Sequence, residues 1–138
     1  MSGNETEALL RRARQFIDAH YDTELDLEQI AGQTGFSRFH FIRLFQRTFA
    51  TTPHQYLTQR RLERARELLD SSELSVTEIC FAVGFQSLGS FSTLFHRSTG
   101  QAPSLYRARV FQGFSLPRRF IPGCYGVVFG IPPLRRAN

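Results

Sequence analysis

The sequence predicts an all-α fold in which two similar helical blocks are joined by one long helix. Apolar residues recur at helical spacing through most of residues 6–106. A set of helix-start and turn residues around residues 26–37 returns around residues 75–87, which indicates an internal duplication. Between the two blocks, residues 52–69 show the pattern of a single uninterrupted helix.

The joining helix has a clear start signal. Thr52 can cap its first free amides, Pro53 suits the first helical position, and Gln55 completes a capping box. The apolar side chains form a discontinuous inner stripe at Tyr56, Leu57, Leu62, Ala65, Leu68 and Leu69. The polar side chains fill the other positions, namely Gln59, Arg60, Arg61, Glu63, Arg64, Arg66 and Glu67.

Two helices are expected before the turn at Gly35. The first covers residues 6–20, and its inward positions are Leu9, Ala13, Phe16 and Ile17. After an acidic connector, Asp26 can cap a second helix whose third position is Gln29. The inner face of this second helix carries Leu27, Ile30 and Ala31.

The residues that follow have the pattern of a helix-turn-helix. Ala31 supplies the small side chain needed where two helices cross closely, and Gly35 can take the left-handed backbone of the turn. Ser37 then caps a third helix, expected over residues 38–48. Its core positions are Phe41, Leu44 and Phe45. Its other face carries Phe39, Ile42, Arg43 and Gln46.

The same pattern returns in the second block. Ser75 and Glu78 form a second capping box, and Cys80 stands four residues before Gly84, as Ala31 does before its glycine. Cys80 is therefore interpreted as a small buried residue rather than a reactive thiol. The core positions of the next helix are Phe91, Leu94 and Phe95. One helix-turn-helix pattern is weak evidence, whereas two in tandem are a specific signal.

Charge is strongly positive and unevenly spread. The 138 residues carry 17 basic side chains and 12 acidic ones, a net charge of +5, and the basic residues include no lysine. Residues 1–37 hold three Arg and seven acids, whereas residues 80–138 hold seven Arg and no acid. The lack of lysine is interpreted as a genome-composition bias, but the asymmetry favours a polyanionic partner.

Other chemistries lack their signals. Cys80 and Cys124 lie in unrelated surroundings and the four histidines have no ligand spacing, so we expect neither a metal nor a cofactor. No paired carboxylates, nucleophile elbow or phosphate-cradling glycine loop occurs, so we do not expect an enzyme. Nothing resembles a signal peptide or a membrane span, so we expect a cytoplasmic protein with no membrane partner.

Duplex DNA is the polyanion that suits the outer face of the helix expected over residues 38–48. Its major groove admits one helix, and each base pair presents a distinct pattern of donors and acceptors there. Arg43 can bond both acceptors of a guanine, and Phe39 and Ile42 suit thymine methyl groups. The alternative for Phe39 is packing on the first helix or on a neighbouring lobe. RNA is less suitable because its major groove is deep and narrow.

The second block has a different outer face. It consists of Gly89, Ser92, Thr93 and His96, with Leu88 at its leading end. Thr93 stands where Arg43 stands in the first block, so we expect the first block to supply most of the base discrimination. The joining helix would hold the two reading helices about one duplex turn, roughly 34 Å, apart, so that a monomer binds an asymmetric site.

The motifs together match a known pattern. They are Gly35-Phe36-Ser37, Leu44-Phe45, Thr52-Pro53, Tyr56-Leu57, the run from Arg61 to Leu69, Gly84-Phe85, Phe91, Phe95, Pro103 and Tyr106-Arg107. Over residues 6–108 the chain closely resembles the DNA-binding domain of the AraC/XylS family of bacterial transcription regulators. The resemblance implies seven helices, a bilobed monomer on double-stranded DNA at the nucleoid, and activation through contact with RNA polymerase. The chain resembles the short members that lack a separate sensing domain.

Two sets of contact residues follow from these faces and from the resemblance. Base contacts are expected from Phe39, Ile42, Arg43, Gln46, Leu88, Gly89, Ser90 and Thr93. Phosphate contacts are expected from Ser37, Arg38, Arg47, Arg60, Arg61, Ser87, His96 and Arg97. Family members often have a polar or basic residue in place of Ile42 and an Arg in place of Thr93.

The chain is thus assigned four parts. These are an N-terminal helix-turn-helix lobe (1–51), the joining helix (52–70), a C-terminal helix-turn-helix lobe (71–108) and a tail (109–138). The tail combines aromatic residues with Gly, Pro and Arg and is expected to be irregular or partly disordered. It is interpreted as a segment draped over or beside the second lobe, or as part of a further module or an arm that touches DNA or a protein.

The competing interpretation is a protein-interaction or adaptor module. In that case the arginine-rich face meets an acidic protein and the aromatic tail supplies a docking patch. Steep salt dependence on duplex DNA distinguishes the two, because each phosphate contact releases counterions.

Overall fold

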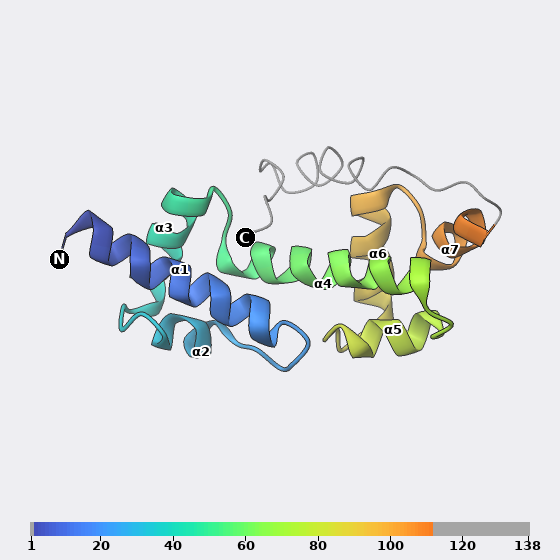
Figure 1. Cartoon of the computed structure of the whole chain (residues 1–138), viewed down its shortest axis with the longest axis horizontal. Coiled ribbons are helices and arrows are strands. Elements are labelled where there is room, and N and C mark those ends of the chain that lie inside the picture. The colour runs from blue at the N-terminus through green and yellow to red at the C-terminus, as the bar shows by residue number, and fades with distance from the viewer. Residues whose placement is uncertain (1, 112–138) are drawn as a thin grey trace. The chain divides into compact units, whose positions relative to one another are not determined.

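The computed structural model describes residues 2–111, which form seven α-helices (Figure 1). Their bounds are α1 Gly3–His20, α2 Leu27–Gly32, α3 Arg38–Phe49, α4 Pro53–Ser71, α5 Val76–Ala82, α6 Leu88–Thr99 and α7 Pro103–Phe111. No strand occurs among these residues, and the all-α prediction is confirmed. None of the described helices is both long and apolar enough to cross a membrane.

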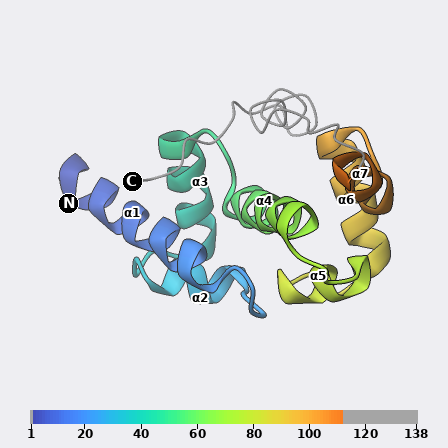
Figure 2. The ribbon, with the colours of Figure 1, turned by 45° about the vertical axis from the view of Figure 1, so that its right-hand side comes forward.

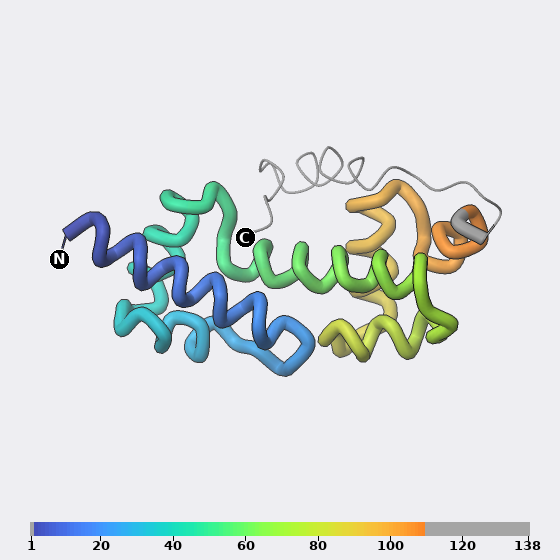
Figure 3. The backbone as a smooth tube through the Cα atoms, in the orientation of Figure 1, coloured from blue at the N-terminus to red at the C-terminus, as the bar shows by residue number. Residues whose placement is uncertain are grey.

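The chain divides into two compact units within α4. The first unit comprises the residues up to Arg61, and the second unit begins at Leu62. Figure 3 shows α4 as one continuous coil, so a single helix supplies residues to both cores. At the other end of the second unit, α7 runs to Phe111. The remainder of the predicted tail lies outside the described residues.

Side-chain caps fix the starts of α1 and α4. The Glu5 amide donates to the Ser2 hydroxyl at 3.3 Å, so α1 begins three residues before its predicted start. The Gln55 amide donates to Thr52 Oγ1 at 3.2 Å, and the Thr52 amide donates to the Gln55 side chain at 3.1 Å. This exchange confirms the capping box predicted for the long helix.

Capping boxes also begin the first helix of each helix-turn-helix. At α2, the Gln29 amide donates to Asp26 Oδ1 at 2.7 Å, and the Asp26 amide donates to Gln29 Oε1 at 3.0 Å. At α5, Ser75 and Glu78 make the same exchange at 3.0 and 3.1 Å. Both predicted boxes are confirmed, and the duplication seen in the sequence is repeated in local structure.

In the first unit, α1 packs against both α2 and α3 (Figure 2). The buried apolar side chains of this unit are Leu10, Ala13, Ile17, Ile30, Ala31, Phe41, Phe45, Tyr56 and Leu57. The inward residue of the first turns is Leu10 and not Leu9, which is half-buried. The reason is that positions 10, 13 and 17 share one face of a 3.6-residue helix.

The described part of the second unit, residues 62–111, contains an apolar cluster. It contains Leu62, Ala65, Leu69, Ile79, Cys80, Val83, Phe85, Phe91, Phe95 and Tyr106. Cys80 is fully buried, which confirms its interpretation as a core residue. Burial also raises the pKa of its thiol.

Two of the α4 residues predicted to lie outside the apolar stripe are buried. Gln59 and Arg66 are 3% and 8% exposed, although the sequence places them outside the apolar stripe. Helix geometry explains the difference, because positions 59, 62, 66 and 69 recur every three to four residues and lie on one face.

Candidate DNA-binding surface

Both helix pairs turn at a glycine with left-handed backbone. Gly35 has a φ of +77° and Gly84 a φ of +103°, values that strain residues with a Cβ atom. In the first turn, the Thr34 hydroxyl donates to the Ala31 carbonyl at 2.7 Å, and the Phe36 amide donates to Thr34 Oγ1 at 3.1 Å. These bonds fix the direction in which α3 leaves α2.

The leading end of α3 is exposed. Ser37 caps the helix by accepting a hydrogen bond from the His40 amide at 3.3 Å. Phe39 is 69% exposed, so it does not pack on α1. The Arg38 guanidinium lies 5.0 Å from the centre of the Phe39 ring, and one of its nitrogens is 3.9 Å from a Glu28 carboxylate oxygen. A large aromatic group is thus held in water beside a cation.

The exposed face continues along α3 through Arg43, Gln46 and Arg47. Neither Arg43 nor Arg47 forms an ion pair with another residue of the described part of the chain. The guanidinium groups of both residues are therefore available to an external acceptor. This face combines donor groups, which can bond guanine acceptors, with an aromatic ring, which can contact a thymine methyl group.

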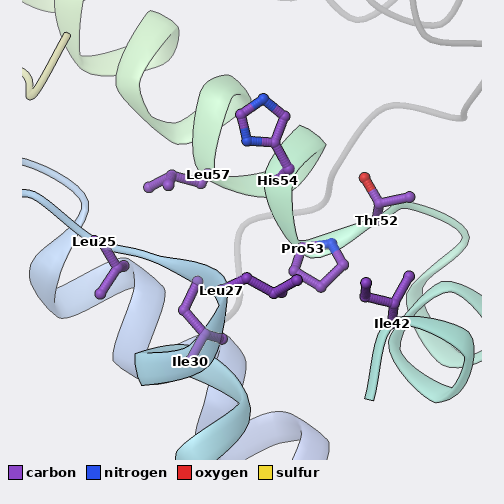
Figure 4. A pocket seen from close by; sticks show the side chains of 8 residues that line it. All are labelled: Leu25, Leu27, Ile30, Ile42, Thr52, Pro53, His54 and Leu57. Atoms are coloured by element: carbon purple, nitrogen blue, oxygen red, sulfur yellow. The ribbon is translucent and has the colours of Figure 1, made fainter. Parts of the chain in front are cut away.

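Ile42 differs from the other residues predicted on this face. It is half-buried and lines an apolar pocket of about 210 Å³ in the first unit (Figure 4). The other lining residues are Leu25, Leu27, Ile30, Thr52, Pro53, His54 and Leu57. Figure 4 shows Ile42 entering from α3 on the side of Pro53. Because its side chain is shared with this pocket, its contact with a thymine methyl stays a prediction.

The corresponding face of α6 is exposed but nearly uncharged. Ser87 caps the helix by accepting a hydrogen bond from the Ser90 amide at 3.3 Å. The exposed residues of this face and of its last turns are Leu88, Gly89, Ser90, Thr93, His96 and Arg97. The basic residues come late in the helix, so the leading end offers hydroxyl groups and backbone rather than guanidinium groups.

Two residues predicted to contact phosphate are engaged inside the first unit. Arg61 donates from Nε to the Tyr21 carbonyl at 2.7 Å and from Nη2 to the Thr23 carbonyl at 2.9 Å. Burial lowers the pKa of Arg61. Arg60 Nε lies 3.1 Å from Asp18 Oδ1. Phosphate contacts from these two side chains stay predictions, and the geometry does not favour them.

The second unit uses an arginine in a similar way, which the sequence analysis did not find. Arg107 donates from Nη1 to the Leu74 carbonyl and from Nη2 to the Ser72 carbonyl, the latter at 3.2 Å. In both units, an arginine thus holds the connector that leads into the first helix of the helix-turn-helix. Arg61 and Arg107 are not at equivalent positions of the repeat, so the duplication gave no signal.

Two capped helices, each placed by a glycine turn and each presenting an exposed face, define a tandem helix-turn-helix domain. Within residues 2–111, no group of three or more His, Cys, Asp or Glu side chains lies close enough to hold a metal ion.

Comparison with known proteins gives the same class. A sequence profile described as a helix-turn-helix domain matches residues 30–109. The MmsAB operon regulatory protein of Pseudomonas aeruginosa is 38% identical over 98 residues, which are 71% of this chain and 32% of that protein. The first curated relatives are similarly longer, since the chain spans 32–39% of their lengths.

Solved structures agree. The DNA-binding domain of AdpA, determined in complex with a target DNA, has a TM-score of 0.72 and 29% identity and covers 78% of this chain and 98% of its own. An AraC-type transcriptional regulator from Chromobacterium violaceum has a TM-score of 0.69 and 32% identity, covering 77% and 95%. The chain belongs to the AraC/XylS family of transcription regulators, a family of DNA-binding proteins rather than of enzymes.

Proposed function

We propose that this chain regulates transcription by reading a specific double-stranded DNA sequence, with α3 and α6 each inserted in a major groove. The observation that carries the proposal is the α3 face, where Arg43 is exposed with no carboxylate partner among residues 2–111 and Phe39 is 69% exposed. The AdpA domain, whose structure contains target DNA, has the same fold and supports this mode of binding.

The first unit supplies most of the base readout in this proposal. Arg43 donates two hydrogen bonds to guanine O6 and N7, a contact worth about 1–3 kcal/mol of discrimination. Phe39 covers a thymine methyl, and Gln46 reaches a further base edge with its amide. Ile42 contributes an apolar edge to the same surface to the extent that it is exposed.

The second unit contributes weaker base contacts through Leu88, Gly89, Ser90 and Thr93, none of which is charged. The residues proposed to grip phosphate across the two units are Ser37, Arg38, Arg47, Ser87, His96 and Arg97. The two serine oxygens already accept backbone hydrogen bonds, so these hydroxyls donate to phosphate. Such contacts fix register without carrying sequence information.

The proposal extends to the assembly. One chain occupies one asymmetric site, because the exposed faces of α3 and α6 carry different residues. The placement of the two helices in successive grooves is predicted from the length of the joining helix. Activation through RNA polymerase is implied by the family resemblance, and both stay predictions. The mass of the complex with its selected site tests the monomer, and transcription with purified polymerase tests activation.

The decisive experiment starts from selection of bound duplex fragments from a genomic library. The best fragment is then titrated with the wild type, Arg43→Ala, Thr93→Ala and Arg12→Ala at two salt concentrations. Arg12 is an exposed residue of α1, and its replacement removes the same charge outside the proposed surface. We expect Arg43→Ala to weaken binding by about 1–3 kcal/mol, while the other two variants bind nearly as the wild type does.

The salt dependence separates the two candidate functions. In a plot of log affinity against log salt concentration, a DNA-binding surface gives a slope of about −0.9 per phosphate contact. No enrichment of any fragment over random DNA would show that this chain does not read sequence and would favour the adaptor interpretation.

A further inference from the structure

Gly89 lies in the first turn of α6, two residues after the capping residue Ser87, and is exposed. Glycine is less favourable than alanine inside a helix, because its backbone loses more conformational freedom on folding. An exposed helical glycine therefore weakens α6. Its presence is explained if the missing side chain serves a purpose other than stability.

The fold gives no reason for the glycine. The φ angle of Gly89 lies outside the left-handed region, unlike those of Gly35 and Gly100 at +77° and +83°. A Cβ atom added at Gly89 would meet only the Ser87 hydroxyl oxygen, at 3.8 Å, which is an ordinary van der Waals distance. Alanine is thus compatible with both the backbone and the space at this position.

The duplication shows what stands at the same place in the first unit. Ser37 and Ser87 cap α3 and α6, so Phe39 and Gly89 are the second helical residue in each case. Phe39 projects a ring that is 69% exposed. One recognition helix thus presents an aromatic side chain where the other presents bare backbone.

The surroundings of Gly89 keep that backbone accessible. Ser90 and Thr93 on the same exposed face are short and uncharged. Leu88 is 39% exposed, whereas the other large side chain at this end of α6, Phe91, is fully buried. A molecule that approaches the first turn of α6 can therefore reach its main chain at Gly89, which is a common use of glycine at ligand-binding surfaces.

We infer, on the basis of the proposed function, that Gly89 is a specificity-determining residue that sets how deeply α6 enters the major groove. Without a side chain at this position, the first turn lies against the duplex at van der Waals distance. The main chain of the first turn and the Ser90 hydroxyl then come within hydrogen-bond reach of the base edges. A methyl group at residue 89 moves the helix outward by about 1.5 Å, the length of a carbon–carbon bond, and puts these groups out of reach.

The test compares Gly89→Ala and Gly89→Leu with a matched control, Gly32→Ala. Gly32 is the exposed last residue of α2, a Cβ atom there meets nothing within 4 Å, and it belongs to no proposed contact set. Each variant is measured twice, by thermal unfolding of the free protein and by titration of the DNA fragment selected by the wild type.

We expect all three variants to unfold at or above the wild-type temperature, since alanine and leucine favour helix more than glycine does. Gly89→Ala binds the fragment about tenfold more weakly, an effect of the size of one mismatched base pair. Gly89→Leu binds more weakly still, and Gly32→Ala binds as the wild type does.

Two results overturn the inference. If Gly89→Ala binds like the wild type, the missing side chain is not needed for docking, although the proposed function stands. If Gly89→Ala unfolds at a lower temperature, the glycine has a structural role. Failure of the wild type itself to enrich any fragment is a different result, which removes the proposed function first.

Discussion

The Tyr56 hydroxyl donates a 2.6 Å hydrogen bond to Asp18 Oδ1 and so joins the start of α4 to α1. The same carboxylate oxygen lies 3.1 Å from Arg60 Nε. Tyr56 is buried, and its ring is 6.1 Å from that of Phe45 in α3. Through this hydrogen bond and this ring contact, Tyr56 joins α4 to both α1 and α3, the helix that carries the first recognition face.

Replacement Tyr56→Phe removes this hydrogen bond and leaves the ring in place. We expect the free energy of unfolding to fall by about 1.5–3 kcal/mol, the usual net contribution of a hydrogen bond to a charged group. Urea unfolding at neutral pH measures the change. An unaltered midpoint would show that the contact does not stabilise the unit.

The same substitution should change the response to alkaline pH. Burial raises the pKa of Tyr56 above its ordinary value of 10.0, and the hydrogen bond to Asp18 raises it further. The folded state then holds this proton more tightly than the unfolded state, so the stabilisation is complete below pH 10 and is lost as pH rises above it. The difference in urea unfolding midpoint between the wild type and Tyr56→Phe should become smaller above about pH 10. A constant difference would contradict this assignment.

Ala50→Gly should stabilise the protein. Ala50 ends α3 with a φ of 59°, and the equivalent residue at the end of α6 is Gly100, with a φ of 83°. A left-handed backbone costs alanine about 1 kcal/mol relative to glycine. Gly100→Ala should lower the free energy of unfolding by a similar amount. A Cβ atom there meets nothing within 4 Å, so the cost is only conformational. Urea midpoints that move in the same direction for both variants would refute the argument.

Glu78 should make the free energy of unfolding depend on pH in the acidic range. Its hydrogen bonds with the backbone and side chain of Ser75 lower its pKa below 4.5. The ionised Glu78 side chain therefore stabilises the folded state at pH values above its ordinary pKa. This stabilisation is lost as pH falls through the lower pKa of the folded state. Glu78→Gln keeps the capping geometry, as Gln29 does at α2, but does not titrate. The two proteins should differ in urea midpoint near neutrality and converge in acid, and parallel pH profiles would contradict the prediction.

Substitutions at Arg61 and Arg47 should distinguish a structural role from a DNA-binding role. Arg61→Ala removes two charge-assisted hydrogen bonds to carbonyls and should cost about 2 kcal/mol of stability, with no change in the salt slope of DNA binding. Arg47→Ala should leave stability nearly unchanged and reduce that slope by about one. A reduced slope for Arg61→Ala would instead support a phosphate contact.

Local features of the fold were predictable, because their determinants lie within four residues of each other. The caps at Asp26, Ser37, Thr52 and Ser75 follow from side chains that reach the amide three positions ahead. The early start of α1 had a comparable signal, since Ser2 precedes Glu5 by three residues.

Contacts between distant residues were not predictable. Tyr56 and Asp18 are 38 residues apart, and nothing in either helix alone marks them as partners. Arg61 looks like a solvent-exposed cation in sequence, yet it binds carbonyls of the connector before α2. The outer face of α3 was predicted to be exposed, but Ile42 is half-buried. Its burial depends on how α2 and α4 pack beside it around the pocket that it lines.

The most direct test of the central claim, unequal reading of DNA by the two helices, is a base-substitution scan of the selected site. Every base pair is replaced in turn, and affinities are measured for the wild type, Arg43→Ala and Thr93→Ala. The account predicts that Arg43→Ala loses its preference at one G·C pair, a difference of about 1–3 kcal/mol, while Thr93→Ala keeps the wild-type profile. A uniform loss of affinity at all positions in Arg43→Ala, or a larger loss of preference in Thr93→Ala, would contradict it.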